Sequence, residues 1–185
     1  MMIILKQKVV ALQAPVSDRE GAMMEPKYQE NVQYARSLVA TGKAEEMMPR
    51  DVFWAPITAK RFLSLQDIDG DDDFFSSDLT NEQMHDRLSH VGDVGRQSGL
   101  KLIATFSAKD EYVPKHVDVC SLSERLCQAM NGIILKDDES NIDEENSVAS
   151  NIILENGNHR LSQGENDALQ FVQSVKDKLK LVKNN

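Results

Sequence analysis

Long hydrophobic runs are missing from this chain of 185 residues. The apolar start, residues 1–5, is interrupted by Lys6, Gln7 and Lys8, and it is far too short for a membrane span or a secretory signal. Hydrophobic residues still make up 41% of the chain, which is enough for the core of one ordinary domain. We therefore expect a soluble protein of the cytoplasm without a membrane partner.

Basic residues are also few. The 21 Lys and Arg are outnumbered by 30 Asp and Glu, which leaves a formal net charge of -9. The phosphate backbone of a nucleic acid attracts proteins through clustered Lys and Arg side chains. We therefore expect that this chain does not bind nucleic acid.

Cysteine is nearly absent, since the chain has only Cys120 and Cys127. The two lie seven residues apart on one expected helix, about 10 Å apart along its axis. This distance is too long for a disulfide between them. No base stands beside either residue in the sequence, so we expect reduced thiols without a nucleophilic role.

Aromatic residues make up only 5% of the chain, and they are concentrated in one segment. Residues 47–78 contain four of the six Phe and the only Trp, without the spacing of a helix or a strand. Two interpretations remain open. The segment, over about residues 47–80, forms a cap that covers a pocket, or its aromatic side chains merely pack it onto the body of the protein.

An acidic run at residues 67–73 invites comparison with the calcium loop of an EF-hand. Counted from Asp69, the sixth position is Phe74, where glycine is needed, and the twelfth is Thr80, where Glu is needed. The spacing therefore predicts a solvated loop and no metal site. An acidic metal-binding module at residues 67–73 remains an alternative.

The remaining sequence alternates between strand and helix patterns. Short apolar runs predict strands at 8–13, 101–106 and 151–155, and helical spacing predicts helices at 26–40, 80–91, 121–130 and 165–181. Thr80 with Gln83, and Ser121 with Glu124, have the pattern of capping boxes. An acidic loop at about 136–148 is expected to be loosely ordered. This order predicts an α/β fold, a parallel sheet with helices on its faces and a cap segment.

Two candidate catalytic residues follow strands of this sheet. Asp110 comes just after the strand at 101–106, and His159 just after the strand at 151–155. An Asp at such a place, taken alone, more often caps a turn or a helix. Asp followed by His, however, is the order of acid and base in α/β-hydrolases. A carboxylate that holds an imidazole N–H orients the ring so that it can take a proton from a serine hydroxyl.

Five motifs are spread over nearly the whole chain. They are LQAPVSDRE at 12–20, PITA with an Arg at 56–61, GDDD followed by FSSDL at 70–79, KDEYVP at 109–114, and GNH at 157–159. In these motifs the chain resembles an α/β-hydrolase family of plants and fungi that is catalogued as a domain of unknown function, and to which a fungal siderophore esterase is similar. The resemblance implies that Asp110 is the triad acid, that His159 is the triad base, and that the substrate is a small-molecule ester. It implies no cofactor.

One motif of such hydrolases is missing. No Gly-x-Ser-x-Gly occurs in the chain, and Ser98, although followed by Gly99, has no glycine two residues before it. In the family the nucleophile lies upstream of the equivalent of Leu12. The resemblance therefore implies the C-terminal part of an α/β-hydrolase fold, a single domain over residues 1–185 without its N-terminal half. Its first strand would have an unpaired edge, so we expect self-association through this edge.

Three functions follow from these observations. We favour the C-terminal portion of a serine hydrolase, an esterase with a Ser-His-Asp triad, that is inactive alone because it is a truncated form or an incomplete gene model. The alternative is a non-catalytic α/β-hydrolase-like binding or scaffold protein. The third is the metal-binding module. Whether the chain is an enzyme therefore stays open at the level of sequence.

Overall fold

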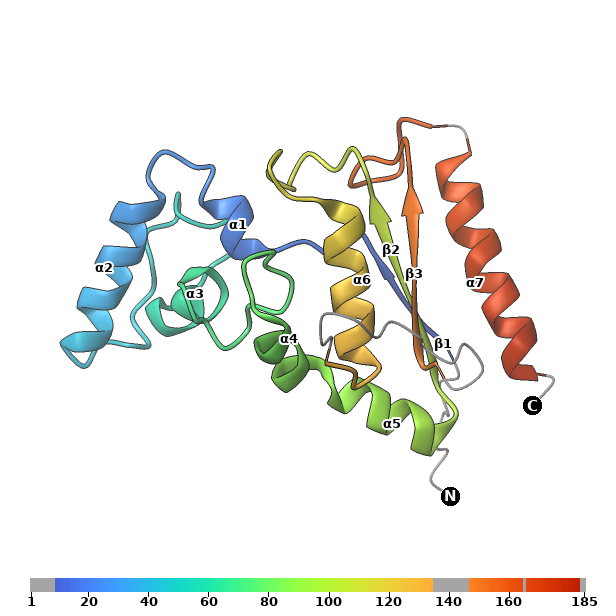
Figure 1. Cartoon of the computed structure of the whole chain (residues 1–185). Coiled ribbons are helices and arrows are strands. Elements are labelled where there is room, and N and C mark those ends of the chain that lie inside the picture. The colour runs from blue at the N-terminus through green and yellow to red at the C-terminus, as the bar shows by residue number, and fades with distance from the viewer. Residues whose placement is uncertain (1–8, 135–146, 165, 184–185) are drawn as a thin grey trace, which may run out of the picture. The chain divides into compact units, whose positions relative to one another are not determined.

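The computed structural model describes residues 9–134, 147–164 and 166–183 (Figure 1). In chain order its elements are β1 (Val9–Gln13), α1 (Asp18–Ala22), α2 (Tyr28–Ala40), α3 (Ala59–Gln66), α4 (Asn81–Leu88), α5 (His90–Ser98), β2 (Lys101–Ser107), α6 (Val119–Met130), β3 (Ala149–Leu154) and α7 (Asp167–Lys183). They form two compact units. Unit 1 comprises the described residues of Met1–Pro15, Ser77–Tyr112 and His116–Asn185, and unit 2 comprises Val16–Ser76 and Val113–Lys115.

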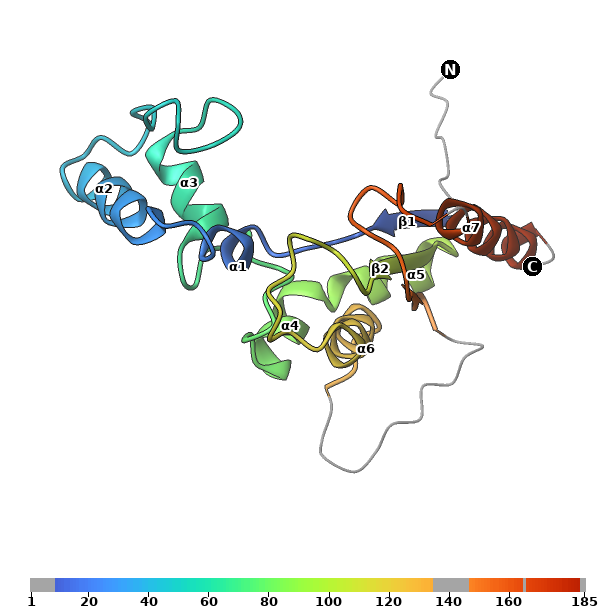
Figure 2. The same cartoon turned by 90° about the horizontal axis from the view of Figure 1, so that it is seen from above.

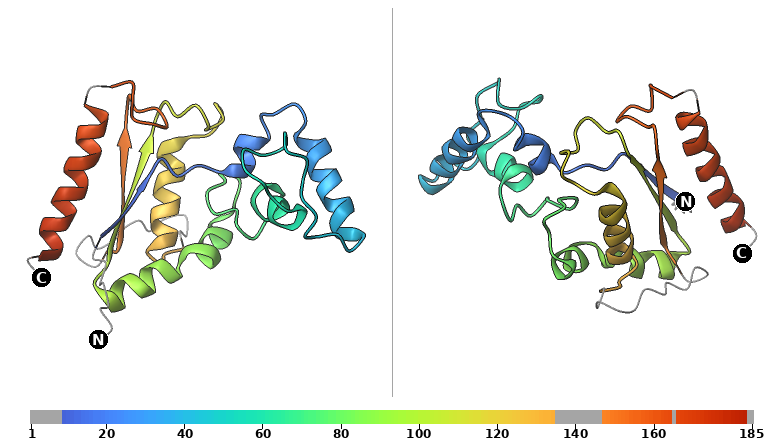
Figure 3. Two further views of the ribbon diagram at one scale, coloured as in Figure 1. Left: turned by 180° about the vertical axis from the view of Figure 1, so that it is seen from behind. Right: turned by 45° about the horizontal axis from the view of Figure 1, so that its top comes forward.

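A parallel sheet forms the body of unit 1, with its strands in the order β1, β2, β3 (Figure 3). Gln13 of β1 stands opposite Thr105 of β2, and Ser107 of β2 stands opposite Leu154 of β3. The carboxyl ends of the three strands therefore meet at one edge of the sheet. All residues of β2 after its first are buried, as expected for a central parallel strand that is covered on both faces. The predicted parallel α/β sheet is confirmed.

Helices α6 and α7 lie on opposite faces of this sheet (Figure 1, Figure 2). Helix α6 contacts β2 and β3 and buries Leu122, Leu126 and Met130, whereas α7 contacts β1 and β2. The apolar residues of α7 are only partly used in this contact. Leu169 is 65% exposed and Val172 is 43% exposed, so α7 leaves these two apolar side chains uncovered by the described residues, beside polar neighbours such as Gln170 and Gln173.

N-cap residues explain where helices α4 and α6 begin. Thr80 and Gln83 form the predicted capping box of α4. The predicted cap of α6, Ser121, is wrong, because α6 begins two residues earlier and its N-cap is Asp118. The carboxylate of Asp118 accepts hydrogen bonds from the backbone N–H groups of Cys120 and Ser121. Asp and Ser are both good N-caps. The helix begins at the upstream candidate, Asp118, whose carboxylate pairs two backbone N–H groups of the first turn that would otherwise lack a partner within the helix.

Unit 2 has its own core between α2 and α3. Tyr28, Val32 and Phe62 are among its buried side chains. Helix α3 contradicts the prediction that residues 47–78 have no helical spacing. Thr58 caps it by accepting a hydrogen bond from the Arg61 backbone N–H. Among the aromatic side chains of this segment, Phe62 is buried in the core of unit 2, whereas Trp54 is 85% exposed.

The prediction that the acidic run at residues 67–73 is a solvated loop is wrong for its last residue, Asp73. Asp73 is buried, and its carboxylate accepts a hydrogen bond at 2.7 Å from the Nε of Arg19, which is also buried. Ser76 donates a further hydrogen bond to Asp73. Buried charges of this kind are stable only when they are paired. No group of three His, Cys, Asp or Glu among the described residues is arranged to hold a metal ion.

Two further expectations concern a membrane span and the acidic loop. None of the described helices has the length and apolar character needed to cross a membrane. The predicted acidic loop at about 136–148 falls, except for its last two residues, outside the described part of the chain.

Candidate active site

Asp110 and His159 meet at the carboxyl edge of the sheet in unit 1. Asp110 follows β2 and His159 follows β3, and the two strands are parallel neighbours. The Nδ1 of His159 lies 2.9 Å from the Oδ2 of Asp110. The carboxylate is buried, with 2% of its side chain exposed, while the imidazole is 32% exposed. The structure therefore brings together the two residues that the sequence singled out.

The carboxylate of Asp110 is held in place by its own turn. Its second oxygen, Oδ1, accepts a hydrogen bond at 2.9 Å from the backbone N–H of Tyr112. The Asp110 backbone N–H donates to the carbonyl oxygen of Ser107, the last residue of β2. An ionised carboxylate only accepts hydrogen bonds, so the Nδ1 of neutral His159 carries the proton. The lone pair on Nε2 then remains available to accept a proton from a substrate or a nucleophile.

His159 is also held by groups that the sequence analysis did not identify. The side chain of Gln13 donates from Nε2 to the carbonyl oxygen of His159, and the His159 backbone N–H donates to the Oε2 of Glu111. The ring of Tyr112 packs edge-on against the imidazole at a centroid distance of 4.7 Å. Glu111 and Tyr112 belong to the motif that contains Asp110, so that motif could have indicated them. Gln13 belongs to another of the motifs, LQAPVSDRE at 12–20, but that motif does not show its contact with His159, which depends on the folded register of β1.

Gly157 brings the histidine loop close to the end of β2. A Cβ atom at this position would lie 3.0 Å from the Oγ of Ser107 and 3.0 Å from the Cβ of Leu154. Its carbonyl oxygen accepts a hydrogen bond from the backbone N–H of Lys109 at 3.0 Å. Glycine thus allows the loop before His159 to approach the loop that carries Asp110.

A nucleophile is not part of this constellation. Among the described residues, no hydrogen bond joins the Nε2 of His159 to a hydroxyl or a thiol. The two thiols do not replace it. Burial raises the pKa of the Cys127 thiol to about 12, so it stays protonated at neutral pH, and Cys120 lies exposed on the first turn of α6. The described residues thus pair Asp110 with His159 and place no hydroxyl or thiol in hydrogen-bond contact with the imidazole.

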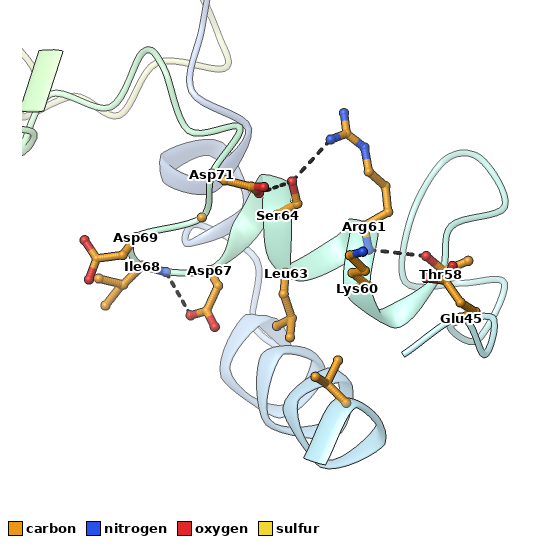
Figure 4. A pocket seen from close by; sticks show the side chains of 12 residues that line it. Glu45, Thr58, Lys60, Arg61, Leu63, Ser64, Asp67, Ile68, Asp69 and Asp71 are labelled. Atoms are coloured by element: carbon orange, nitrogen blue, oxygen red, sulfur yellow. Dashed lines mark hydrogen bonds between the residues drawn. The ribbon is translucent and has the colours of Figure 1, made fainter. Parts of the chain in front are cut away.

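Unit 2 contains a separate groove of about 630 Å³ (Figure 4). It is lined by α3 and by the loop that follows it, with side chains of both charges, among them Lys60 and Asp69, and with Leu63 as an apolar wall. Ser64 donates a hydrogen bond to Asp71 within this lining, and Arg61 donates one to Ser64. The lining residues include no histidine or cysteine, so the hydroxyl groups of Thr58 and Ser64 have no imidazole beside them in the groove.

Three proteins show what the chain is similar to. Fusarinine C esterase sidJ from Aspergillus fumigatus is 30% identical over 181 residues, which cover 83% of this chain and 49% of that protein. Esterase AN6793 from Emericella nidulans is 32% identical over 145 residues, which cover 62% of this chain and 38% of that protein. The solved structure of siderophore hydrolase EstB from Aspergillus fumigatus matches with a TM-score of 0.67 and 27% identity, and the match covers 93% of this chain and 56% of that chain.

The comparisons confirm the fold and the resemblance that the motifs predicted. The parallel sheet of unit 1 and its flanking helices match the fold of EstB, an α/β-hydrolase. The relatives are named as esterases and a hydrolase, and this chain spans about half of their length. The profile of a family described as "Protein of unknown function (DUF1749)" matches residues 5–180, and the chain belongs to this family.

Proposed function

We propose that this chain supplies the acid and the base of a serine ester hydrolase, with Asp110 and His159 as two members of a Ser-His-Asp triad. The observation that carries the proposal is the 2.9 Å contact between the buried carboxylate and Nδ1 of the imidazole at the carboxyl edge of a parallel sheet. This edge is where open α/β sheets bind their ligands. The order of the two residues in the chain is that of the hydrolase triad.

In this proposal the serine comes from outside the described residues. The Nε2 of His159 takes the proton of the serine hydroxyl while the serine oxygen attacks the ester carbonyl carbon. The resulting imidazolium is stabilised by Asp110 and gives its proton to the leaving alcohol as the C–O bond breaks. Water then attacks the acyl-enzyme in the same way, and His159 returns the proton to the serine. The 185 residues alone, without a nucleophile, do not hydrolyse esters at an appreciable rate.

The substrate class in this proposal is a small-molecule ester, and no cofactor takes part. The names of two relatives, a fusarinine C esterase and a siderophore hydrolase, support an ester substrate. Unit 2 contains most of the predicted cap at about 47–80 and has a groove that is lined by charged and apolar side chains.

A chimera tests the proposal. The part of EstB that this chain does not cover is joined to residues 9–185, and hydrolysis of a p-nitrophenyl ester is measured. The proposal predicts hydrolysis that is lost when His159 is replaced by Ala, with unchanged circular dichroism. A folded chimera whose activity does not depend on His159 would overturn it.

A second function, the alternative left open by the sequence, is equally consistent with the lack of Gly-x-Ser-x-Gly in these 185 residues. A non-catalytic binding or scaffold protein of the same fold needs no nucleophile. It would bind an ester substrate without cleaving it. In the chimera experiment this function predicts a folded protein that binds the ester, measured by calorimetry, but shows no turnover above the His159→Ala variant.

A further inference from the structure

We infer that Gln13, the last residue of β1, and Glu111, in the turn after β2, are positioning residues that hold the backbone of His159. The inference rests on the proposed role of His159 as the general base. The Nε2 of Gln13 donates to the carbonyl oxygen of His159 at 2.6 Å. The backbone N–H of His159 donates to the Oε2 of Glu111 at 3.0 Å. Both polar backbone groups of the same residue are thereby fixed.

The loop that carries His159 depends on such individual contacts, because residues 155–164 have no helix or strand structure. Other residues of this loop are held by backbone–backbone hydrogen bonds. The N–H of Gly157 donates to Leu154, and the N–H of Leu161 donates to Asn158. Among the described residues, no backbone–backbone hydrogen bond of the loops uses the N–H or the carbonyl of His159. Gln13 and Glu111 satisfy these two groups instead.

Gln13 is well placed to act as a fixed support. It is the last residue of β1 and is paired in register with Thr105 of β2. The next residue, Ala14, has a φ of +48° and donates its N–H to the carbonyl oxygen of Thr105 at 2.7 Å. The side chain of Gln13 then reaches the loop after β3, although β1 and β3 are not neighbours in the sheet. One side chain thus links the two outer strands across the candidate site.

Glu111 acts from the opposite side of the same residue. Its carboxylate is exposed, and the hydrogen bond from the His159 backbone N–H holds the pKa of the carboxyl below its ordinary value. It is therefore ionised at neutral pH and forms a charge-assisted hydrogen bond. Asp110 alone holds only the ring, at Nδ1, so the backbone contacts are what restrict the position of the Cα atom. A displacement of about 1 Å in a catalytic group can cost roughly 100-fold in rate.

The test uses the 185-residue chain labelled with ¹⁵N, in which NMR measures the ratio of the Nδ1–H to the Nε2–H tautomer of neutral His159. In Gln13→Ala this ratio should fall roughly threefold to tenfold, the effect of one net hydrogen bond. Glu111→Ala should have a similar effect, whereas Glu111→Gln, which keeps a carbonyl acceptor, should stay near the wild-type ratio. Gln163→Ala, an exposed glutamine of the same loop, is the matched control and should change nothing.

The outcomes separate this inference from the proposed function. If the wild-type chain holds the Nδ1–H tautomer and the ratio is the same in Gln13→Ala and Glu111→Ala, the positioning role is wrong while the Asp110–His159 pair stands. If the wild-type chain itself holds mainly the Nε2–H tautomer, both fail. Should Gln13→Ala not fold, as judged from its amide spectrum, Gln13→Met keeps the bulk of the side chain without its donor and gives the same test.

Discussion

The Nδ1 of His159 lies 2.9 Å from the Oδ2 of Asp110, although the two residues are 49 positions apart in the chain. The parallel pairing of β2 with β3 brings them together, because each residue follows the carboxyl end of its strand. The contact joins a buried carboxylate to a partly exposed ring, which is the arrangement that the proposed role of His159 as a base requires.

The buried pair of Arg19 and Asp73 should be essential for the stability of unit 2. Replacing Asp73 by Ala leaves the guanidinium of Arg19 buried without this carboxylate, and we expect a loss of about 3–5 kcal/mol in the free energy of unfolding. Urea titration followed by circular dichroism measures the loss. Glu46→Ala removes an exposed ion pair with Lys43 and is the control, with little change expected. Equal stabilities of the two variants would contradict the importance of the buried pair.

Gly95 should not tolerate a side chain. A Cβ atom there would lie 2.1 Å from the Cγ1 of buried Val148, so Gly95→Ala must push α5 away from this residue. We expect a loss of about 1–3 kcal/mol in the free energy of unfolding. The double variant with Val148→Ala removes the opposing methyl groups and should recover part of that loss. No recovery in the double variant would show that the strain arises elsewhere.

The two thiols should differ sharply in reactivity. Burial raises the pKa of Cys127 to about 12, so its reactive thiolate is absent at pH 8, whereas Cys120 is exposed. Because the folded pKa is raised, Cys127 becomes reactive only near pH 12 or on unfolding. Mass spectrometry after treatment with iodoacetamide at pH 8 should find one label on the folded chain and two in guanidinium. Rapid labelling of both thiols in the folded chain would argue against this burial.

The isolated chain should self-associate through its uncovered apolar surface. Leu169 and Val172 of α7 are exposed, and β1 is an outer strand of the described sheet. Exposed apolar patches and open strand edges both favour association. Analytical ultracentrifugation should show a concentration-dependent increase in mass, which the double variant Leu169→Gln, Val172→Gln weakens. Ser174→Gln, at a half-buried position of the same helix, controls for the substitution itself. A chain that stays monomeric at high concentration would contradict this prediction.

Much of unit 1 could be predicted from local patterns. The strands predicted at 101–106 and 151–155 lie within two residues of the bounds of β2 and β3, because a buried parallel strand has a short apolar run that ends abruptly at a turn. The proximity of Asp110 and His159 followed from the parallel order of these strands.

What could not be predicted depends on contacts between distant parts of the chain. Arg19 and Asp73 are 54 positions apart, and nothing in an acidic run shows which carboxylate is buried. Gln13 likewise meets His159 only in the folded sheet. Helix α3 is a different case. Thr58, its cap, was visible in the sequence, but eight residues are too few for a clear helical period.

The most direct test of the account is the rate of ester hydrolysis by the chimera with EstB when Asp110 is replaced by Asn. An Asn at this position no longer selects the Nδ1–H tautomer of His159, so the account predicts a loss of roughly 10⁴-fold in kcat with little change in KM. A folded Asp110→Asn chimera that hydrolyses the ester as fast as the unmodified chimera would contradict it.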